Sequence, residues 1–239
     1  MAVESLYREP EAGEEPTRWP ALEMHDVFKI YRSGDVETVA LRGVDLELHA
    51  GQMIAILGPS GCGKSTLLAL AAGLDRVSAG EVRSFGTSLV TQTEAELAEY
   101  RARGVGMVFQ SDNLWPTLSA RENVVMALSL AAQDIPASDA DLALAALGLG
   151  ERGDHRASAL SGGEQQRVAI AAAIARRAPL VLADEPTGEL DASSQQVVLS
   201  ALRRLPGEHG CAVLVVTHSH VVAGAADQVI EMRDGTRVR

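Results

Sequence analysis

One segment constrains the fold of this 239-residue chain more than any other, the glycine-rich run at residues 58–66. The residues before it, 53–58 (MIAILG), form a short continuous apolar run of the kind that makes a buried strand. The residues after it, 65–74 (STLLALAAGL), have a good helical pattern. A strand, a glycine loop and a helix in this order predict the opening unit of an α/β fold.

The glycine-rich run has the composition of a phosphate-binding loop, GxxxxGK[ST]. Its residues are Gly58, Pro59, Ser60, Gly61, Cys62, Gly63, Lys64, Ser65 and Thr66. Glycines let backbone N–H groups curl around phosphate oxygens, and the following helix adds its positive N-terminal end. Lys64 is then a point charge for the β- and γ-phosphates, and the Ser65 hydroxyl is a ligand for Mg²⁺. The alternative, an ordinary turn before a helix, does not account for both the pattern and its flanks.

Other segments predict how the chain is organised around this loop. Alternating apolar residues between 24 and 48 indicate strands of an antiparallel element, and 179–184 and 211–218 are again short buried-strand runs. Residues 111–160 are rich in Ala and Leu and predict helices without strands. The expected fold class is therefore α/β, a P-loop NTPase core with a mostly parallel sheet, an N-terminal antiparallel β element and a helical subdomain inserted at about 111–160. Residues 21–239 form this one domain, and residues 1–20 are expected to be a mobile acidic tail.

Composition limits the function classes. A net charge of −11 argues against a general nucleic-acid or anionic-lipid surface, which needs a basic face. No apolar run approaches the ~20 residues that cross a bilayer, and the N-terminus lacks the pattern of a signal peptide. We therefore expect a cytosolic chain that meets a membrane only through a partner. Cys62 and Cys211 lack metal-ligand spacing and are expected to be free thiols. Cys62 is either a small filler of the loop or a redox-sensitive group.

A second glycine-opened helix start lies at residues 160–167, LSGGEQQR. Such a start aims backbone N–H groups and the Ser161 hydroxyl at a phosphate. Ser161 and Glu164 also fit a capping box, a structural role that leaves Gly162 and Gly163 unexplained. Farther along, the buried strand at 180–184 ends in Asp184 and is followed by Glu185, at the edge of the sheet where α/β sites lie.

These segments stand in the order found in ATP-binding cassette (ABC) ATPases, and over residues 22–239 the chain resembles that family. The resemblance makes 160–167 the signature motif and 180–191 the Walker B and D-loop region. It implies that Asp184 holds Mg²⁺ through its water shell and that Glu185 polarises the attacking water. His218 resembles the switch histidine that contacts the γ-phosphate. Gln110 resembles the glutamine that reaches Mg²⁺ and the water.

Two aromatic residues have alternatives that the sequence leaves open. Tyr31 resembles the family's aromatic that stacks on adenine, or it is a plain strand residue. Trp115 lies in a proline-containing segment, 114–118, that directly follows Gln110 and opens the helical insert. It is either an exposed anchor for a partner or part of the insert's own core.

The resemblance further implies ATP and Mg²⁺ as cofactors and a head-to-tail homodimer, in which each signature faces the other subunit's loop. An integral membrane permease would be the partner, and the chain would lie peripherally on the cytoplasmic face of the cell membrane. The segments 113–124 and 187–191 resemble the subgroup of macrolide exporters, lipoprotein-releasing complexes and the cell-division ATPase. Glu189 and Ser219 depart from that subgroup, which usually has Asn and Asp at these positions. Transport, mechanical signalling through a membrane partner, and a regulatory module without turnover remain as hypotheses, although Glu185 and His218 argue against the last.

Overall fold

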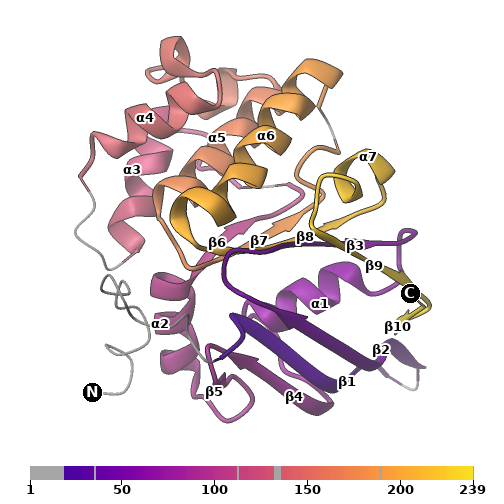
Figure 1. Cartoon of the computed structure of the whole chain (residues 1–239). Helices are drawn as coiled ribbons and strands as arrows, with labels where there is room; N and C mark the ends of the chain where they lie inside the picture. Colours follow the sequence, from indigo (N-terminus) through magenta and orange to yellow (C-terminus); the bar gives the residue numbers. More distant parts are fainter. Residues whose placement is uncertain (1–18, 35, 112, 132–135, 189, 239) are drawn as a thin grey trace.

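The structure of the protein is a computed structural model that describes residues 19–34, 36–111, 113–131, 136–188 and 190–238. Residues 1–18 of the predicted acidic tail and the D-loop residue Glu189 lie outside this range. The described chain consists of two sheets, with helices between them and on the outer face of the second sheet (Figure 1). Within the described residues, no helix combines the length and apolar character that crossing a membrane requires.

The first sheet is antiparallel and has the strand order β2-β1-β4-β5. Its strands are β1 Leu22–Ser33, β2 Val36–Leu48, β4 Ala79–Ser84 and β5 Thr87–Ser88. β1 and β2 pair in long register from Leu22 with Leu48 to Ser33 with Val36. This long hairpin is the antiparallel element that the alternating apolar residues predicted.

The second sheet has the order β10-β9-β3-β8-β7-β6 and is parallel except for its edge strand β10. Its strands are β3 Met53–Leu57, β6 Val105–Val108, β7 Leu180–Asp184, β8 Ala212–Thr217, β9 Gln228–Arg233 and β10 Thr236–Arg237. β3 and β8 are buried along their whole length, since helices or the other sheet cover both faces. The predicted fold class, a mostly parallel sheet with an N-terminal antiparallel element and helices, is confirmed.

Helices cover the parallel sheet on both sides. They are α1 Lys64–Ala71, α2 Glu94–Gly104, α3 Ala120–Leu130, α4 Asp139–Ala146, α5 Gly162–Ala175, α6 Ala192–His209 and α7 His220–Ala223. α1 lies between the two sheets and contacts strands of both, while α5 and α6 lie on the opposite face (Figure 1). α3 and α4, within the segment 111–160, pack on α5.

Side-chain alternation divides the core between these two layers. In β7, Leu180 and Leu182 pack with α1 and the antiparallel sheet, whereas Val181 and Ala183 pack with the helices α3–α6. The two-residue period of a strand therefore supplies both cores from one segment. Because both faces are filled, the parallel strands are held rigidly and their carboxyl ends have fixed positions.

Candidate nucleotide-binding site

The carboxyl ends of the parallel strands meet beside the glycine-rich loop and form a pocket of about 330 Å³. β3 leads into the loop, β7 ends at Asp184, and β8 is followed by His218. The pocket is lined by Thr38, Val39, Ala40, Ser60, Gly61, Gly63, Lys64, Ser65, Thr66, Gln110, Asp184, Glu185 and His218. The fold thus brings most of the predicted site residues into one place, although they are spread along the sequence from Ser60 to His218.

The loop keeps its shape through close backbone contacts that only glycine permits. Gly63 has φ +101°, and a Cβ there would lie 2.4 Å from the Ala40 carbonyl oxygen. A Cβ on Gly58 would lie 2.7 Å from the Cys62 Sγ. The Cys62 side chain is buried against the loop, which supports its interpretation as a filler. Glycine at these positions therefore lets the loop pack closely on its neighbours, as the compact shape of a phosphate-binding loop requires.

Lys64 begins α1, and its ammonium group stays within the loop. Lys64 Nζ donates to the carbonyl oxygens of Gly58, at 2.7 Å, and Pro59, at 2.9 Å. The residue is only 7% exposed. A buried ammonium held by two carbonyls is a positive charge that a phosphate oxygen can approach directly.

Ser65 and Asp184 come from α1 and β7 and meet at the pocket floor, where their side chains hydrogen-bond. Burial raises the pKa of the Asp184 carboxyl; the Ser65 hydrogen bond and the Lys64 charge oppose this, while the Glu185 charge adds to it. A desolvated carboxylate beside a hydroxyl is a set of hard oxygen donors, which suits Mg²⁺ with phosphate oxygens and water as its other ligands. No cluster of three or more His, Cys, Asp or Glu that could hold a metal is found in the described ranges.

Glu185 has an unusual backbone at the tip of β7. Its φ of +45° lies in the left-handed region, which costs free energy for a residue with a Cβ. Its N–H donates to the Val216 carbonyl at 2.9 Å, which anchors the turn to β8. Its carboxylate accepts from Thr217 Oγ1 at 2.9 Å and lies 2.8 Å from His218 Nδ1. The strained backbone thus aims the carboxylate along the sheet edge, beside Lys64 and Asp184.

Gln110 follows β6 and reaches the same pocket, and a pair of amides holds the segment around it. Asn113 Oδ1 accepts from the Phe109 N–H at 2.7 Å, and Asn113 Nδ2 donates back to the Phe109 carbonyl. Asn113 Nδ2 also donates to Gln166 Oε1, on α5, at 3.3 Å. The sequence gives no signal for this contact between Asn113 and Gln166, because nothing in their spacing indicates that they meet. It links the Gln110 segment to α5.

The residues of the second glycine-opened helix do not line this pocket. Ser161, Gly162, Gly163 and Glu164 form the N-terminus of α5, within the helical layer. Ser161 Oγ accepts from the Glu164 N–H, while the Glu164 carboxylate accepts from the Ser161 N–H at 2.9 Å. The capping box is therefore present. Within one chain, these four residues and the glycine-rich loop do not line the same pocket.

Tyr31 lies beside the pocket but does not line it. Its strand neighbour in the sheet register is Thr38, which does line the pocket. Its hydroxyl accepts a hydrogen bond from Thr66 of the glycine-rich loop. The side chain is 41% exposed, so an aromatic surface is accessible at the edge of the pocket.

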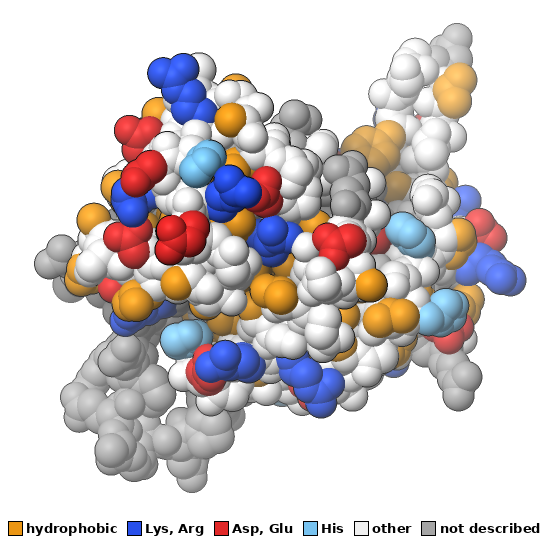
Figure 2. Space-filling view, turned by 90° about the horizontal axis from the view of Figure 1, so that it is seen from above, with side chains coloured by type: hydrophobic (Ala, Val, Ile, Leu, Met, Phe, Trp, Pro, Cys, Tyr) orange, Lys and Arg blue, Asp and Glu red, His pale blue; other side chains and the backbone are white. Residues whose placement is uncertain are grey.

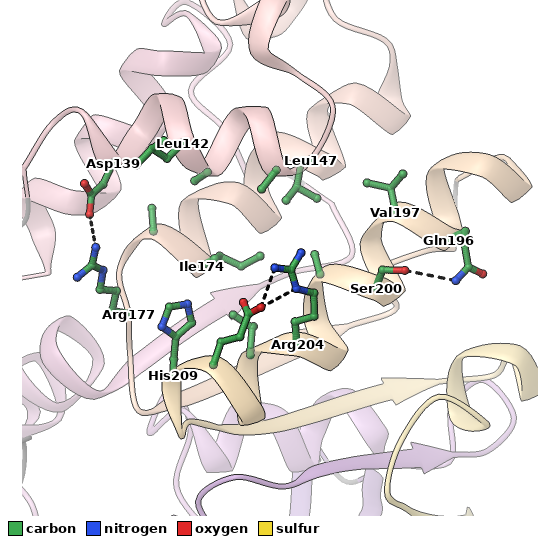
Figure 3. Close-up of a pocket in the computed structure, with 16 residues that line it drawn as sticks. Asp139, Leu142, Leu147, Ile174, Arg177, Gln196, Val197, Ser200, Arg204 and His209 are labelled. Atoms are coloured by element: carbon green, nitrogen blue, oxygen red, sulfur yellow. Dashed lines mark hydrogen bonds and ion pairs between the residues drawn. The ribbon is translucent and has the colours of Figure 1, made fainter. Parts of the chain in front are cut away.

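A larger cavity, of about 470 Å³, lies elsewhere, between α4, α5 and α6 (Figure 3). Leu142, Leu147 and Ile174 line it, and charged residues at its rim pair with each other, such as Asp139 with Arg177 at 2.6 Å. It contains no phosphate-binding element, so size alone does not identify the site. On the face seen in Figure 2, acidic and basic side chains are interspersed, and no basic patch is gathered there.

Comparison with known proteins gives the family. The family described as ABC transporter matches residues 41–188. The macrolide export ATP-binding/permease protein MacB of Azoarcus sp. (strain BH72) is 43% identical over 95% of this chain but over only 35% of its own length. The lipoprotein-releasing system ATP-binding protein LolD of Ruegeria sp. (strain TM1040) is 43% identical, over 91% of this chain and 97% of its own.

Among solved structures, a dimeric, post-hydrolysis state of the ATP-binding cassette MJ0796 bound to ADP and Pi superimposes with a TM-score of 0.87. It is 36% identical in sequence, over 91% of this chain and 97% of that one. The chain spans about a third of the MacB relatives' length and nearly all of LolD's. With the glycine-rich loop, the Ser65–Asp184 pair and Glu185 gathered in one pocket, the chain belongs to the ABC transporter family, as an ATP-hydrolysing cassette.

Proposed function

We propose that two copies of this chain close on two Mg·ATP molecules and power a membrane permease that exports a substrate or extracts one from the envelope. The observation that carries this proposal is the pocket at the sheet edge, where a phosphate cradle, a hard-oxygen pair and a carboxylate for water activation converge. The names of the MacB and LolD relatives support a role in export or lipoprotein release.

Each pocket residue has a place in the proposed hydrolysis. Lys64 and the loop N–H groups spread the charge of the β- and γ-phosphates, since phosphoryl transfer depends mainly on positioning and charge stabilisation. Mg²⁺, held beside Ser65 and Asp184, would neutralise charge between these phosphates. Glu185 would orient and polarise the attacking water, and His218, which hydrogen-bonds Glu185, would contact the γ-phosphate.

The place of the signature residues supports the dimer. Ser161 and the glycines after it form a helix N-terminus that can donate to phosphate, but they do not line this chain's own pocket. A head-to-tail pair would bring each signature to the other copy's loop. The MJ0796 cassette bound to ADP and Pi is dimeric, which supports the association of two copies.

The surface beside Gln110 is the proposed contact for the permease. Phe109 and Trp115 are 43% and 50% exposed, in a chain with few aromatic residues. Aromatic side chains held on a surface are typical anchors of protein interfaces. Because Asn113 links this segment to α5, movement of α5 on ATP binding would reach the same surface. The chain would then lie on the cytoplasmic face of the membrane.

The test separates binding from chemistry with two variants of the isolated chain. Lys64→Ala should weaken Mg·ATP binding by ~10- to 100-fold, because a charge-assisted contact is lost. Glu185→Gln should bind Mg·ATP as the wild type does and hydrolyse it ~10²- to 10⁴-fold more slowly. Calorimetric titration and phosphate release measure the two effects. Hydrolysis at the wild-type rate in a folded Lys64→Ala protein would show that the pocket is not the site.

A further inference from the structure

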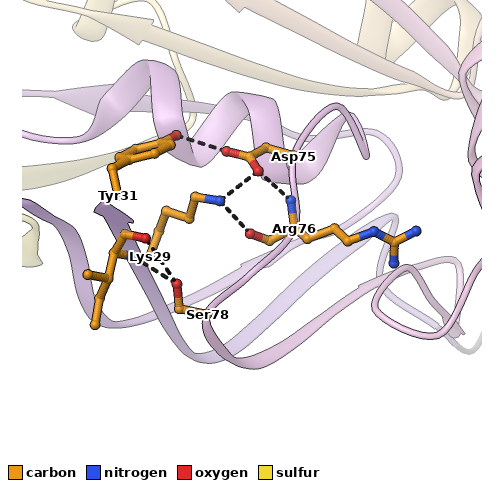
Figure 4. Close-up of polar contacts among 6 residues, drawn as sticks. Lys29, Tyr31, Asp75, Arg76 and Ser78 are labelled. Atoms are coloured by element: carbon orange, nitrogen blue, oxygen red, sulfur yellow. Dashed lines mark hydrogen bonds and ion pairs between the residues drawn. The ribbon is translucent and has the colours of Figure 1, made fainter. Parts of the chain in front are cut away.

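A half-buried ionic network lies next to Tyr31, at the edge of the pocket (Figure 4). Lys29 Nζ donates to Asp75 Oδ1 at 2.6 Å and to the Arg76 carbonyl at 2.8 Å. The second carboxylate oxygen of Asp75 accepts from the Tyr31 hydroxyl at 2.9 Å. One carboxylate therefore joins the lysine and the tyrosine, which are two residues apart on β1, to the turn that follows α1.

The Lys29 ammonium lies over the face of the Tyr31 ring. Lys29 is one of only two lysines in the sequence, and its side chain is 11% exposed. Its ammonium lies 4.8 Å from the centroid of the Tyr31 ring, within cation–π distance. In Figure 4 the ring is seen nearly edge-on, with the ammonium on one side of it. A surface lysine placed only for solubility would not be buried in this way.

The network also ties the ring to both ends of α1. Thr66, in the first turn of α1, hydrogen-bonds the Tyr31 hydroxyl, and Asp75 lies in the turn after the helix. Burial raises the pKa of the Asp75 carboxyl, but hydrogen bonds from Lys29, the Arg76 N–H and Tyr31 outweigh this and lower it overall. Asp75 is thus a stable carboxylate at neutral pH, and the ring orientation is defined relative to the helix that carries Lys64.

We propose that Lys29 and Asp75 are positioning residues that hold Tyr31 as a preset stacking surface for the base of the bound nucleotide. This inference rests on the proposed nucleotide site and on Tyr31 as its stacking residue, and it adds the two residues that hold the ring. An exposed ring that is already held in place loses little conformational freedom when a base stacks on it, so more of the stacking free energy appears as affinity.

The network acts on the base and not on the phosphates. Stacking uses the π face that every base has, so adenine and guanine nucleotides should both gain from it. Inorganic tripolyphosphate, which carries the same phosphate chain without a base, should gain nothing. This difference separates a positioning role from a general structural role, because a collapse of the glycine-rich loop would weaken both ligands.

The experiment compares Mg·ATP and Mg·tripolyphosphate in calorimetric titrations of the full chain. Lys29→Met removes the ammonium and keeps the apolar stem; we expect ATP affinity to fall ~3- to 10-fold while tripolyphosphate affinity is unchanged. Tyr31→Ala should weaken ATP at least as much. In the Tyr31→Ala background, Lys29→Met should cause no further loss, since the two residues act through one ring.

Arg32→Met is the matched control. It removes a positive charge from the neighbouring position of β1, where Arg32 pairs with exposed Glu37 at 2.9 Å and takes no part in the network. Its ATP affinity should match the wild type. Equal losses for ATP and tripolyphosphate in Lys29→Met, additive losses in the double variant, or an equal loss in Arg32→Met would each overturn the positioning role. If the proposed site itself were wrong, the result would be different: Lys64→Ala would bind both Mg·ATP and Mg·tripolyphosphate as tightly as the wild type.

Discussion

Two residues of the pocket, Glu185 and Asp184, have a backbone conformation or a degree of burial that lowers the stability of the folded chain. Glu185 has a left-handed backbone, and Asp184 is a carboxyl whose burial raises its pKa. Such features concentrate where a ligand uses them, since strain and desolvation lower stability unless binding compensates for them. At the residue scale, these two residues lower the stability of the fold and place carboxylates where a bound ligand can use them.

Asp184→Asn should therefore raise the stability of the nucleotide-free chain and lower its rate of hydrolysis. The folded pKa of Asp184 lies above its unfolded value of 3.8, so the carboxyl favours folding at acid pH, and this contribution is lost as pH rises through the folded pKa. At neutral pH the nucleotide-free Asn variant should therefore melt at a higher temperature than the wild type, yet hydrolyse Mg·ATP far more slowly. The melting difference should shrink in acid. A lower melting temperature at neutral pH would contradict the desolvation argument.

At the scale of elements, the turn before α3 determines which side chains beside the pocket are exposed to a partner. Asn123, on α3, is 2% exposed and accepts from the Trp115 N–H at 2.8 Å. Its Nδ2 donates to the carbonyl oxygens of Trp115, at 3.1 Å, and Ser119, at 2.9 Å. The buried amide fixes the turn before α3, and the Trp115 side chain lies half exposed. This favours the anchor interpretation over the core interpretation.

Trp115→Ala should accordingly leave the melting temperature and ATP affinity of the isolated chain nearly unchanged. With the permease it should weaken assembly, measured by copurification, or remove stimulation of hydrolysis. Trp19→Ala is the matched control, since Trp19 is 51% exposed but packs near Gly86, beside the antiparallel sheet. A loss of ~3–5 kcal/mol in the free energy of unfolding of Trp115→Ala would instead indicate a core residue.

On the scale of the whole molecule, the two segments that are proposed to bind phosphate do not share one pocket in a single chain. The loop and its carboxylates form the pocket, while the signature residues lie at the start of α5. Under the proposed function, a single chain would lack one side of the γ-phosphate site, and symmetric association would supply it. The proposed output, closure on ATP and opening after hydrolysis, follows if ATP binds the closed pair more tightly.

Gel filtration of a hydrolysis-deficient chain tests this arrangement. Glu185→Gln should elute as a dimer with Mg·ATP and as a monomer without it. Adding Ser161→Arg should abolish the ATP-dependent dimer and keep nucleotide binding, because the signature then repels its neighbour sterically. Thr93→Arg is the control, since Thr93 heads α2 with the same type of capping box. ATP-dependent dimers of the Ser161→Arg double variant would rule out the signature as the interface.

Local sequence determined the parts of the fold that depend on short-range pattern. The apolar runs of β3, β7 and β8, the alternation in β1 and β2, and the glycine-rich loop were all predictable, because period and turn chemistry are local properties. β4, α2 and β9 were not predicted. α2 buries only Leu97, Tyr100 and Gly104, and β4 has a glycine near its start, so neither has a clear period.

Only the tertiary structure decided which distant residues touch. The bond of Thr217 to Glu185, the contact of Asn113 with Gln166 and the network of Lys29, Tyr31 and Asp75 each join separate elements. No spacing in the chain encodes these contacts, since they arise where parallel strands end side by side and where a hairpin packs on α1. The sequence names the chemical groups of the site, and the packing of two sheets around one helix sets their distances.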